Sequence, residues 1–290
     1  MHDASYTDSA LAILLAFTSA LMIAVGTVWR HSILRSGLGQ AEANSSPLAS
    51  LSRPSWWLSL ALAFGAYAVQ ALALAFGSLL VVQPVLVLSL MLTLMLAARV
   101  ERRPMEADET FWGLILTLCV GVVVILGRPL PGQRIAPTWE WAAFIAAGFL
   151  LGAALFALAY RRPTPAPTKA LLYGIVCGTV FGYLAVFSKA SVDAFTHGGA
   201  AAMLGTWQFW ALIASSIVGT GVQQYAFGAG VLSRSLPAMK IMEPLVALSL
   251  GYVVLGEDFS VSGLAGWGAI VAAIAGMMLA TGMLARKPVA

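Results

Sequence analysis

Long apolar stretches, separated by short polar connections, occupy most of this chain. An α-helix rises about 1.5 Å per residue, so roughly 20 apolar residues cross the hydrocarbon core of a membrane. Nine such stretches can be read from the sequence: Ala10–Trp29, Trp56–Phe76, Leu79–Ala98, Phe111–Leu126, Trp139–Tyr160, Ala170–Ala190, Trp207–Phe227, Val231–Leu255 and Val261–Leu284. The pattern predicts an all-α polytopic membrane protein with about nine transmembrane helices.

The second half of the chain repeats the order of residues seen in the first half. The matched anchors are Gln70 with Gln223, Gly77 with Gly230, Pro84 with Pro244, Trp112 with Trp267, and Gly121 with Gly276. Duplicated sets of apolar helices are typical of secondary transporters. We therefore expect a four-helix repeat in residues 1–128, a linking helix with its loops in 129–168, and a second four-helix repeat in 169–290.

Positive charges are distributed unevenly between the two sides of the predicted helices. The chain has 16 Lys and Arg residues and a net charge of +4, and 11 of those residues lie in connections on one side. Cytoplasmic connections are enriched in Lys and Arg. We therefore expect a protein of the plasma (inner) membrane, with its N-terminus outside and its C-terminus in the cytoplasm. The odd number of crossings would make the two repeats inverted, and the charge gives no reason to expect a nucleic-acid partner.

The composition of the chain limits the classes of function that it can have. The chain is 60% hydrophobic and only 10% charged, where soluble domains carry about 25% charged residues. Cys119 and Cys177 lie inside apolar stretches, so neither a disulfide nor a thiolate metal site is expected. No glycine precedes a lysine, so the chain has no phosphate-binding P-loop motif. We expect a protein that is not an enzyme and that carries no cofactor and no metal.

One carboxylate lies well inside a predicted span. Glu243 sits roughly 18 Å into its helix, near the middle of the bilayer, and Lys240 precedes it by three residues on the same helix face. Ionisable groups at this depth usually face a partner or a cavity. The pair could be a static ion pair or a switch in a transport pathway. Pro237 and Pro244 are expected to break this helix, and Pro84 to break its counterpart, where Gln83 replaces the acid.

Further polar and small residues recur at matched positions. The expected pathway contacts are Gln70, Gln83, Gln223 and Gln224, with Tyr67 and Tyr225 as aromatic faces for a cation or an organic solute. The glycines Gly174, Gly178 and Gly182 are spaced by four and are expected to allow close helix packing. By contrast, Lys189 with Asp193, and Glu257 with Asp258, are expected to be solvated charges at the rim.

The second half carries a motif that resembles a known family. Ser235–Pro237, Glu243–Leu245 and Leu255–Glu257, followed by Gly263 and Gly276, resemble the "P…EP…lGE…G" signature of the drug/metabolite transporter superfamily, EamA-like branch. The resemblance covers most of the chain and implies secondary transport, commonly export, of small organic solutes by alternating access.

The first repeat departs from that signature. Gln83 and Ala97 stand in the places of its two acids. Ten spans are usual in the family, and nine spans with the N-terminus outside look more like the NIPA-type magnesium transporter branch.

Taken together, the residues and the resemblance lead us to expect a secondary active transporter that exports a small metabolite or drug and is coupled to protons. A magnesium transporter of NIPA type is one alternative, although Glu243 beside Lys240 offers few of the oxygen ligands that Mg²⁺ requires. A non-transporting scaffold or flippase component is another. The expected partners are a small-molecule substrate, the lipid bilayer and protons. A second copy of the chain could complete a homodimer.

Overall fold

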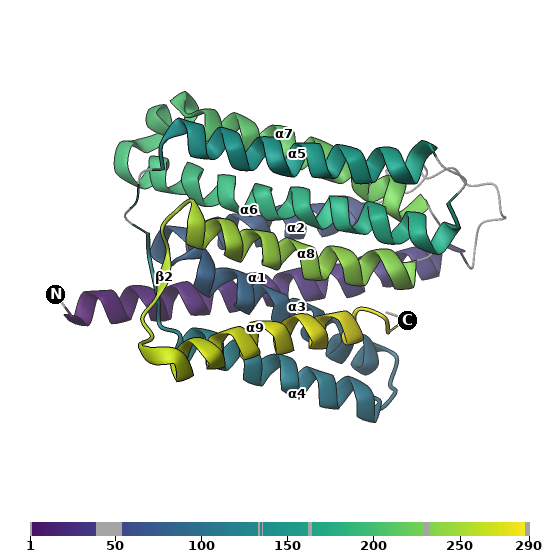
Figure 1. Ribbon diagram of the computed structural model, residues 1–290. Coiled ribbons are helices and arrows are strands. Elements are labelled where there is room, and N and C mark those ends of the chain that lie inside the picture. The colour runs from purple at the N-terminus through teal and green to yellow at the C-terminus, as the bar shows by residue number, and fades with distance from the viewer. Residues whose placement is uncertain are drawn as a thin grey trace.

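The computed structural model describes residues 2–38, 54–132, 134, 136–161, 164–228 and 232–287. This part of the chain folds into nine α-helices that run along one another as an elongated bundle (Figure 1). Their bounds are α1 His2–Leu38, α2 Pro54–Phe76, α3 Leu79–Val100, α4 Ala107–Gly121, α5 Thr138–Arg161, α6 Ala166–Gly205, α7 Trp207–Gly228, α8 Leu232–Val253 and α9 Gly263–Leu284.

Each helix covers one of the apolar stretches, and several are longer than expected. The helix α1 continues to Leu38, past the expected end at Trp29, and α6 continues to Gly205, past Ala190. A helix can extend beyond the apolar run that crosses the membrane, because its backbone hydrogen bonds are formed within the helix. The extension can therefore lie in water as well as in lipid. At Gly199, where φ is 71°, α6 is kinked. The last turn of the fourth stretch is a π-helix, η2, over Val122–Leu126.

Seven of the helices are long and apolar enough to cross a membrane, counted over the residues that the structure describes. They are α1, α3, α4 with η2, α5, α6, α8 and α9; α2 contributes a shorter apolar stretch, Phe64–Phe76. The expectation of an all-α, multi-pass integral membrane protein is thereby confirmed.

The helices pack in two similar groups. In the first half, α1 packs against α2 and α3; in the second half, α6 packs against α7 and α8. The two groups meet where α3 contacts α8 and α2 contacts α6, and α4 packs along α9 on one side of the bundle (Figure 1). The helix α5 packs against α6.

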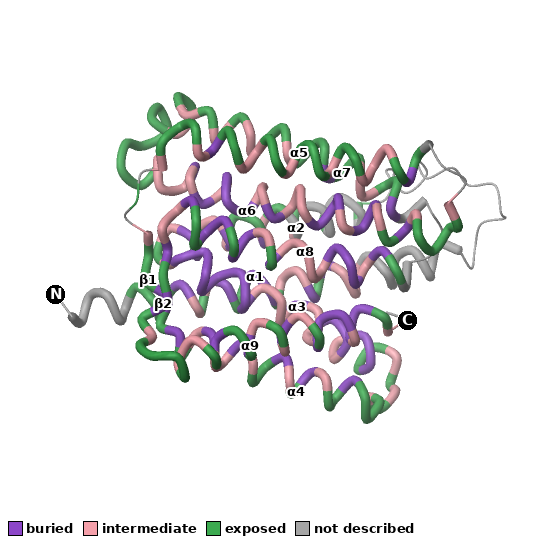
Figure 2. The backbone as a smooth tube through the Cα atoms, in the orientation of Figure 1, coloured by how far each residue is buried: buried purple, intermediate pink, exposed green. Residues whose placement is uncertain are grey.

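Buried residues concentrate on the inner helices (Figure 2). On α1, four alanines spaced by four residues, at positions 12, 16, 20 and 24, are fully buried. The side chains of α5 are largely exposed, and Figure 2 shows the same for α7. In a membrane, apolar side chains need no protein cover because lipid is as apolar as they are. The exposed side chains of Phe149, Leu150 and Leu151 on α5 are therefore expected of a lipid-facing helix.

A short strand pair marks one end of the bundle. The strands β1 (Pro129–Leu130) and β2 (Asp258–Phe259) pair antiparallel, with Pro129 opposite Phe259. They follow η2 and α8 in the chain, so the pair joins the end of the fourth apolar stretch to the end of α8. We call this the strand end; α1 begins at this end and α9 finishes at the other (Figure 1).

Candidate functional site

The small-residue stripe on α6 lies directly against α8. A Cβ atom placed on Gly174 would come within 2.6 Å of the Ser235 carbonyl oxygen, and one on Gly178 within 2.6 Å of the Met239 carbonyl oxygen. At Gly182 the Cβ would lie 2.6 Å from Val246 Cβ. Distances this short leave no room for a side chain, so the glycines set how closely the two backbones approach.

Lys240 and Glu243 flank the face of α8 that meets this stripe. Both side chains are half-buried. The expected ion pair between them is not formed in the structure, where no hydrogen bond or salt bridge joins either side chain to another described residue. An i, i+3 spacing permits such a pair but does not compel it, since the rotamers of both long side chains remain free.

The three prolines do not break their helices. The helix α8 runs without interruption through Pro237 and Pro244, and α3 through Pro84. All three prolines are buried. A proline in a helix removes one backbone bond, and packing against neighbouring helices can hold the remaining turns in place. The expected helix breaks are therefore wrong for this structure.

The expected amide and aromatic contacts divide between the interior and the surface. Gln70 and Gln83 are 8% and 2% exposed, and Gln83 Nε2 has no hydrogen-bond partner among the described residues. Gln223 is half-buried and Gln224 is exposed. The two tyrosines, at positions 67 and 225, are more than half exposed. Only the amides of the first repeat therefore lie deep in the bundle.

Tyr225 belongs to an aromatic cluster between α5, α6 and α7. Its ring lies 5.3 Å from that of Phe156 and 5.9 Å from that of Tyr173. A ring held by other rings in this way contributes to helix packing as well as offering a face to a solute.

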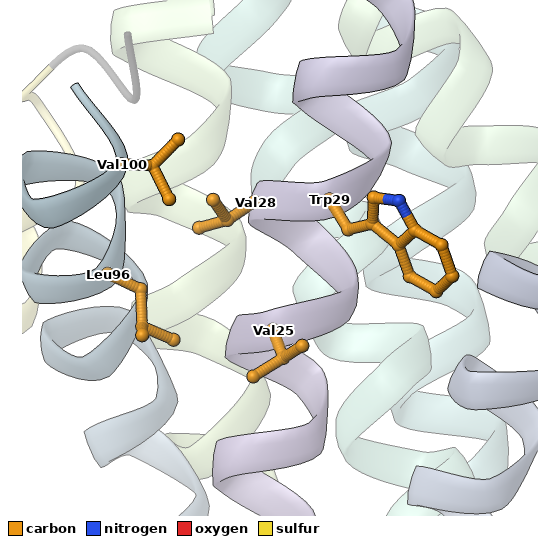
Figure 3. A pocket seen from close by; sticks show the side chains of 5 residues that line it. All are labelled: Val25, Val28, Trp29, Leu96 and Val100. Atoms are coloured by element: carbon orange, nitrogen blue, oxygen red, sulfur yellow. The ribbon is translucent and has the colours of Figure 1, made fainter. Parts of the chain in front are cut away.

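A hollow of about 220 Å³ lies between α1 and α3. Figure 3 shows Val25 and Val28 on α1 facing Leu96 and Val100 on α3, with Trp29 at the side. All five lining side chains are apolar or aromatic, and none is a residue that the sequence indicated as a pathway contact. The hollow suits a lipid chain or an apolar side chain better than a charged solute.

A buried, hydrogen-bonded polar group lies at the strand end, where the sequence predicted solvated charges. Lys189 and Glu257 are 7% and 1% exposed, so that prediction is wrong for both. Lys189 Nζ donates to the Leu74 carbonyl oxygen at 2.8 Å and pairs with Asp193 Oδ1 at 2.8 Å. We call this group, formed by Lys189, Asp193 and Glu257 on the backbone of the α2–α3 turn, the strand-end cap.

Glu257 caps the first turn of α3. Its Oε1 and Oε2 accept the backbone N–H groups of Leu79 and Leu80 at 2.7 and 2.9 Å. The first N–H groups of a helix have no partner inside it and carry partial positive charge, which a carboxylate satisfies well. Ser78 occupies the N-cap position, but its side chain makes no capping bond and its Oγ has no partner among the described residues.

Two glycines make this cap possible. Gly256 has a φ of 67°, a conformation that glycine adopts without strain, and it turns the chain directly after α8. The Glu257 N–H then donates to the Gly251 carbonyl oxygen at 3.0 Å. A Cβ on Gly251 would lie 3.2 Å from Glu257 Oε2, so the absent side chain leaves room for the carboxylate.

The protonation of Glu257 is shifted by this environment. Burial raises the pKa of Glu257 to about 7, while the N–H groups of Leu79 and Leu80 and the charge of Lys189 act to lower it, and Asp193 acts to raise it. Because removal from water disfavours the charged form, a carboxyl group of this kind can change its proton occupancy near neutral pH.

Two features of the sequence point to this buried group. Lys189 lies inside an apolar stretch, and Glu257 follows directly on a Leu-Gly pair at the end of a helix. Ionisable residues inside membrane segments are rarely free of a specific partner.

For metals, the described residues hold no group of three or more His, Cys, Asp and Glu side chains placed to bind an ion.

The fold defines the chain as a helical, multi-pass integral membrane protein. It is 48% identical over 252 residues to an uncharacterized protein of Corynebacterium glutamicum, a match that covers 87% of this chain and 86% of the relative. The chain belongs to the family of that protein. No family model and no solved structure matches the chain.

Proposed function

We propose that this protein is a secondary active transporter that moves a small organic solute across the membrane by alternating access, as an exporter coupled to protons. The observation that carries the proposal is the matched packing of the two halves. The packing contacts that α1 makes with α2 and α3 in the first half correspond to those that α6 makes with α7 and α8 in the second half. Two like groups in contact can rock against each other around a site between them.

The proposed topology has nine spans in two inverted repeats, with α5 as the linking helix. It is supported by the ends of the bundle: α1 begins at the strand end and α9 finishes at the opposite end (Figure 1). An odd number of crossings accounts for this arrangement. Positive charge gathers at the end opposite the strands, where α3, α5 and α9 finish beside Arg99, Arg161 and Arg286, so we propose that the strand end faces the outside.

The proposed pathway runs beside α8. Lys240 and Glu243 are half-buried there, without a mutual salt bridge, so both remain available to a solute or to water. Gln83 on α3 adds a buried amide nitrogen without a described partner. The resemblance to the EamA-like branch supports the same reading, since Glu243 stands in its signature.

Cysteine accessibility tests alternating access without knowledge of the substrate. In a background of Cys119→Ser and Cys177→Ser, the Glu243→Cys variant is reconstituted and treated with a charged, membrane-impermeant thiol reagent from either side. The proposal predicts labelling from both sides, since the pathway opens to each in turn. Leu245→Cys, at an exposed residue on the same helix, is the matched control and should resist the charged reagent. If the reagent labels the Glu243→Cys protein from neither side of the membrane, the proposed pathway is contradicted.

The class of solute is tested in proteoliposomes with an imposed pH gradient. Radiolabelled amino acids, the organic cation ethidium and Mg²⁺ are the probes, and the Glu243→Gln variant is the negative control. Gradient-driven movement of an organic probe supports the proposal. Movement of Mg²⁺ alone, without an effect of the proton gradient, would contradict this proposal and indicate a cation transporter instead.

A further inference from the structure

The two halves of the molecule are bonded to each other at the α2–α3 turn. Lys189 on α6 and Glu257 after α8 belong to the second half, and the backbone groups that they bind belong to the first. The bonds join residues 115 to 178 positions apart in the chain. Any motion that separates the halves at the strand end must break them.

The charges are matched to the polarity of the two helix ends. Carbonyl groups in the last turn of a helix lack internal partners and carry partial negative charge, and the Leu74 carbonyl near the end of α2 receives the Lys189 ammonium. At the start of α3 the polarity is reversed, and the N–H groups of Leu79 and Leu80 receive the carboxylate. The Lys189 and Glu257 side chains therefore hold both arms of a single turn.

We propose that Lys189 and Glu257 form a proton-sensitive latch that closes the strand end of the bundle and must release before that end opens. This inference rests on the proposed alternating access. Lys189 donates one bond of this latch, and the Glu257 carboxyl oxygens accept the other two.

The direction of the pH effect follows from where Glu257 is ionised. In the closed state burial raises the pKa of Glu257 to about 7, whereas a carboxyl group opened to water has its ordinary value of 4.5. The closed state therefore holds the proton more tightly, so acid favours closure. As pH rises towards 7, the buried Glu257 carboxyl group loses its proton, and the cost of keeping the resulting charge away from water favours opening. Linkage limits the change to about tenfold in the opening equilibrium per pH unit between these values.

The other charged groups near Glu257 are few among the described residues. From α6 they are Lys189 and Asp193, while α3 presents only backbone N–H groups. Arg134 lies against the Gly256 backbone, but its guanidinium binds the Val253 carbonyl oxygen and Glu140. Asp258, the next residue, is exposed. Lys189 and Asp193 are paired with each other at 2.8 Å.

Distances between spin labels test the latch directly. Labels are attached at Phe76→Cys and Phe195→Cys, exposed residues on α2 and α6, in the Cys119→Ser, Cys177→Ser background. Pulsed electron resonance in lipid nanodiscs then gives the distance distribution from pH 5 to pH 8. We expect a longer-distance population that grows as pH rises and reaches a plateau above about pH 7.

Three variants make the test specific. Glu257→Gln stays neutral, so its distribution should remain the same at every pH. Lys189→Met removes the bond to the Leu74 carbonyl oxygen and should increase the longer-distance population at every pH. Asp258→Asn, at the exposed neighbour, should behave like the parent protein. Each variant is first checked for a monodisperse profile in detergent, and the Glu257→Gln comparison decides the result if Lys189→Met does not fold.

A distribution that does not change between pH 5 and pH 8 would overturn the latch, as would a Glu257→Gln protein that responds to pH like its parent. No substrate is present in this measurement. Failure of the latch would therefore leave gradient-driven flux in proteoliposomes intact, whereas failure of the proposed transport function would appear in the flux measurement and in the labelling of Glu243→Cys.

Discussion

At the scale of single residues, the absence of a side chain is as decisive here as its presence. The α6 glycines let two helix backbones approach within contact distance, and Gly251 leaves the space that the Glu257 carboxylate fills. The glycine stripe could be found from its spacing alone. The use of Gly251 could not, because it depends on a chain reversal at Gly256 that brings Glu257 back over α8.

Gly178→Ala tests the close contact of α6 with α8. The added Cβ would lie 2.6 Å from the Met239 carbonyl oxygen and 2.7 Å from Met242 Cβ, so the helices must move apart. Overpacking of this kind costs about 1–3 kcal/mol, and the unfolding temperature in detergent should fall. Gly221→Ala on α7, where nothing lies within 4 Å, is the matched control and should be neutral or slightly stabilising. Equal effects of the two variants would show that the α6–α8 contact is looser than the structure describes.

At the scale of helices, the ends of the elements hold more of the polar chemistry than their middles. Glu257 caps α3 at the strand end, and a second group caps α4 at the opposite end. There, Arg103 donates to both carboxylate oxygens of Glu109 at 2.9 and 3.0 Å, and the Glu106 N–H donates to the same carboxylate at 2.8 Å. The Glu109 side chain reaches back in a capping box, which sequence spacing of three residues predicts in principle.

Glu109→Ala is expected to destabilise the α3–α4 turn. Glu109 is only 2% exposed, and it accepts charge-assisted bonds that have no substitute once the carboxylate is removed. Hydrogen bonds to charged groups contribute about 1.5–3 kcal/mol to stability, so the unfolding temperature should fall by several degrees. The comparison is Asp108→Ala, because the Asp108 side chain is 74% exposed and its loss should change the unfolding temperature little. If Asp108→Ala were the more damaging change, the capping role of Glu109 would have to be abandoned.

At the scale of the whole molecule, the bundle consists of two like groups of helices that meet along α3 with α8 and α2 with α6. The described bonds that join their ends at the α2–α3 turn are polar and buried, while much of the outward surface is apolar. A membrane protein gains little by burying apolar surface, so a small number of polar contacts can decide the relative position of its halves.

The two ends of the chain provide a test of the complete topology. With nine crossings and the strand end outside, a fluorescent or phosphatase reporter fused after Ala290 should report the cytoplasm, and a tag before Met1 should be accessible to an antibody in intact spheroplasts. The reason is that α1 begins and α9 finishes at opposite ends of the bundle (Figure 1). Detection of both ends on one side would require an even number of crossings and would remove the inverted repeat.

The sequence by itself determined that the chain is a helical, multi-pass membrane protein and where its helices lie, because apolar length and helical hydrogen bonding are local properties. The tertiary structure alone decided which polar groups are buried and satisfied. Glu257 and Leu79 are 178 positions apart, and nothing within either segment specifies the other. Lys240 and Glu243 lie three positions apart on α8, a spacing that permits a salt bridge, yet the described structure does not form one between them. Burial and pairing depend on what neighbouring elements bring to a site, so only the assembled bundle could determine them.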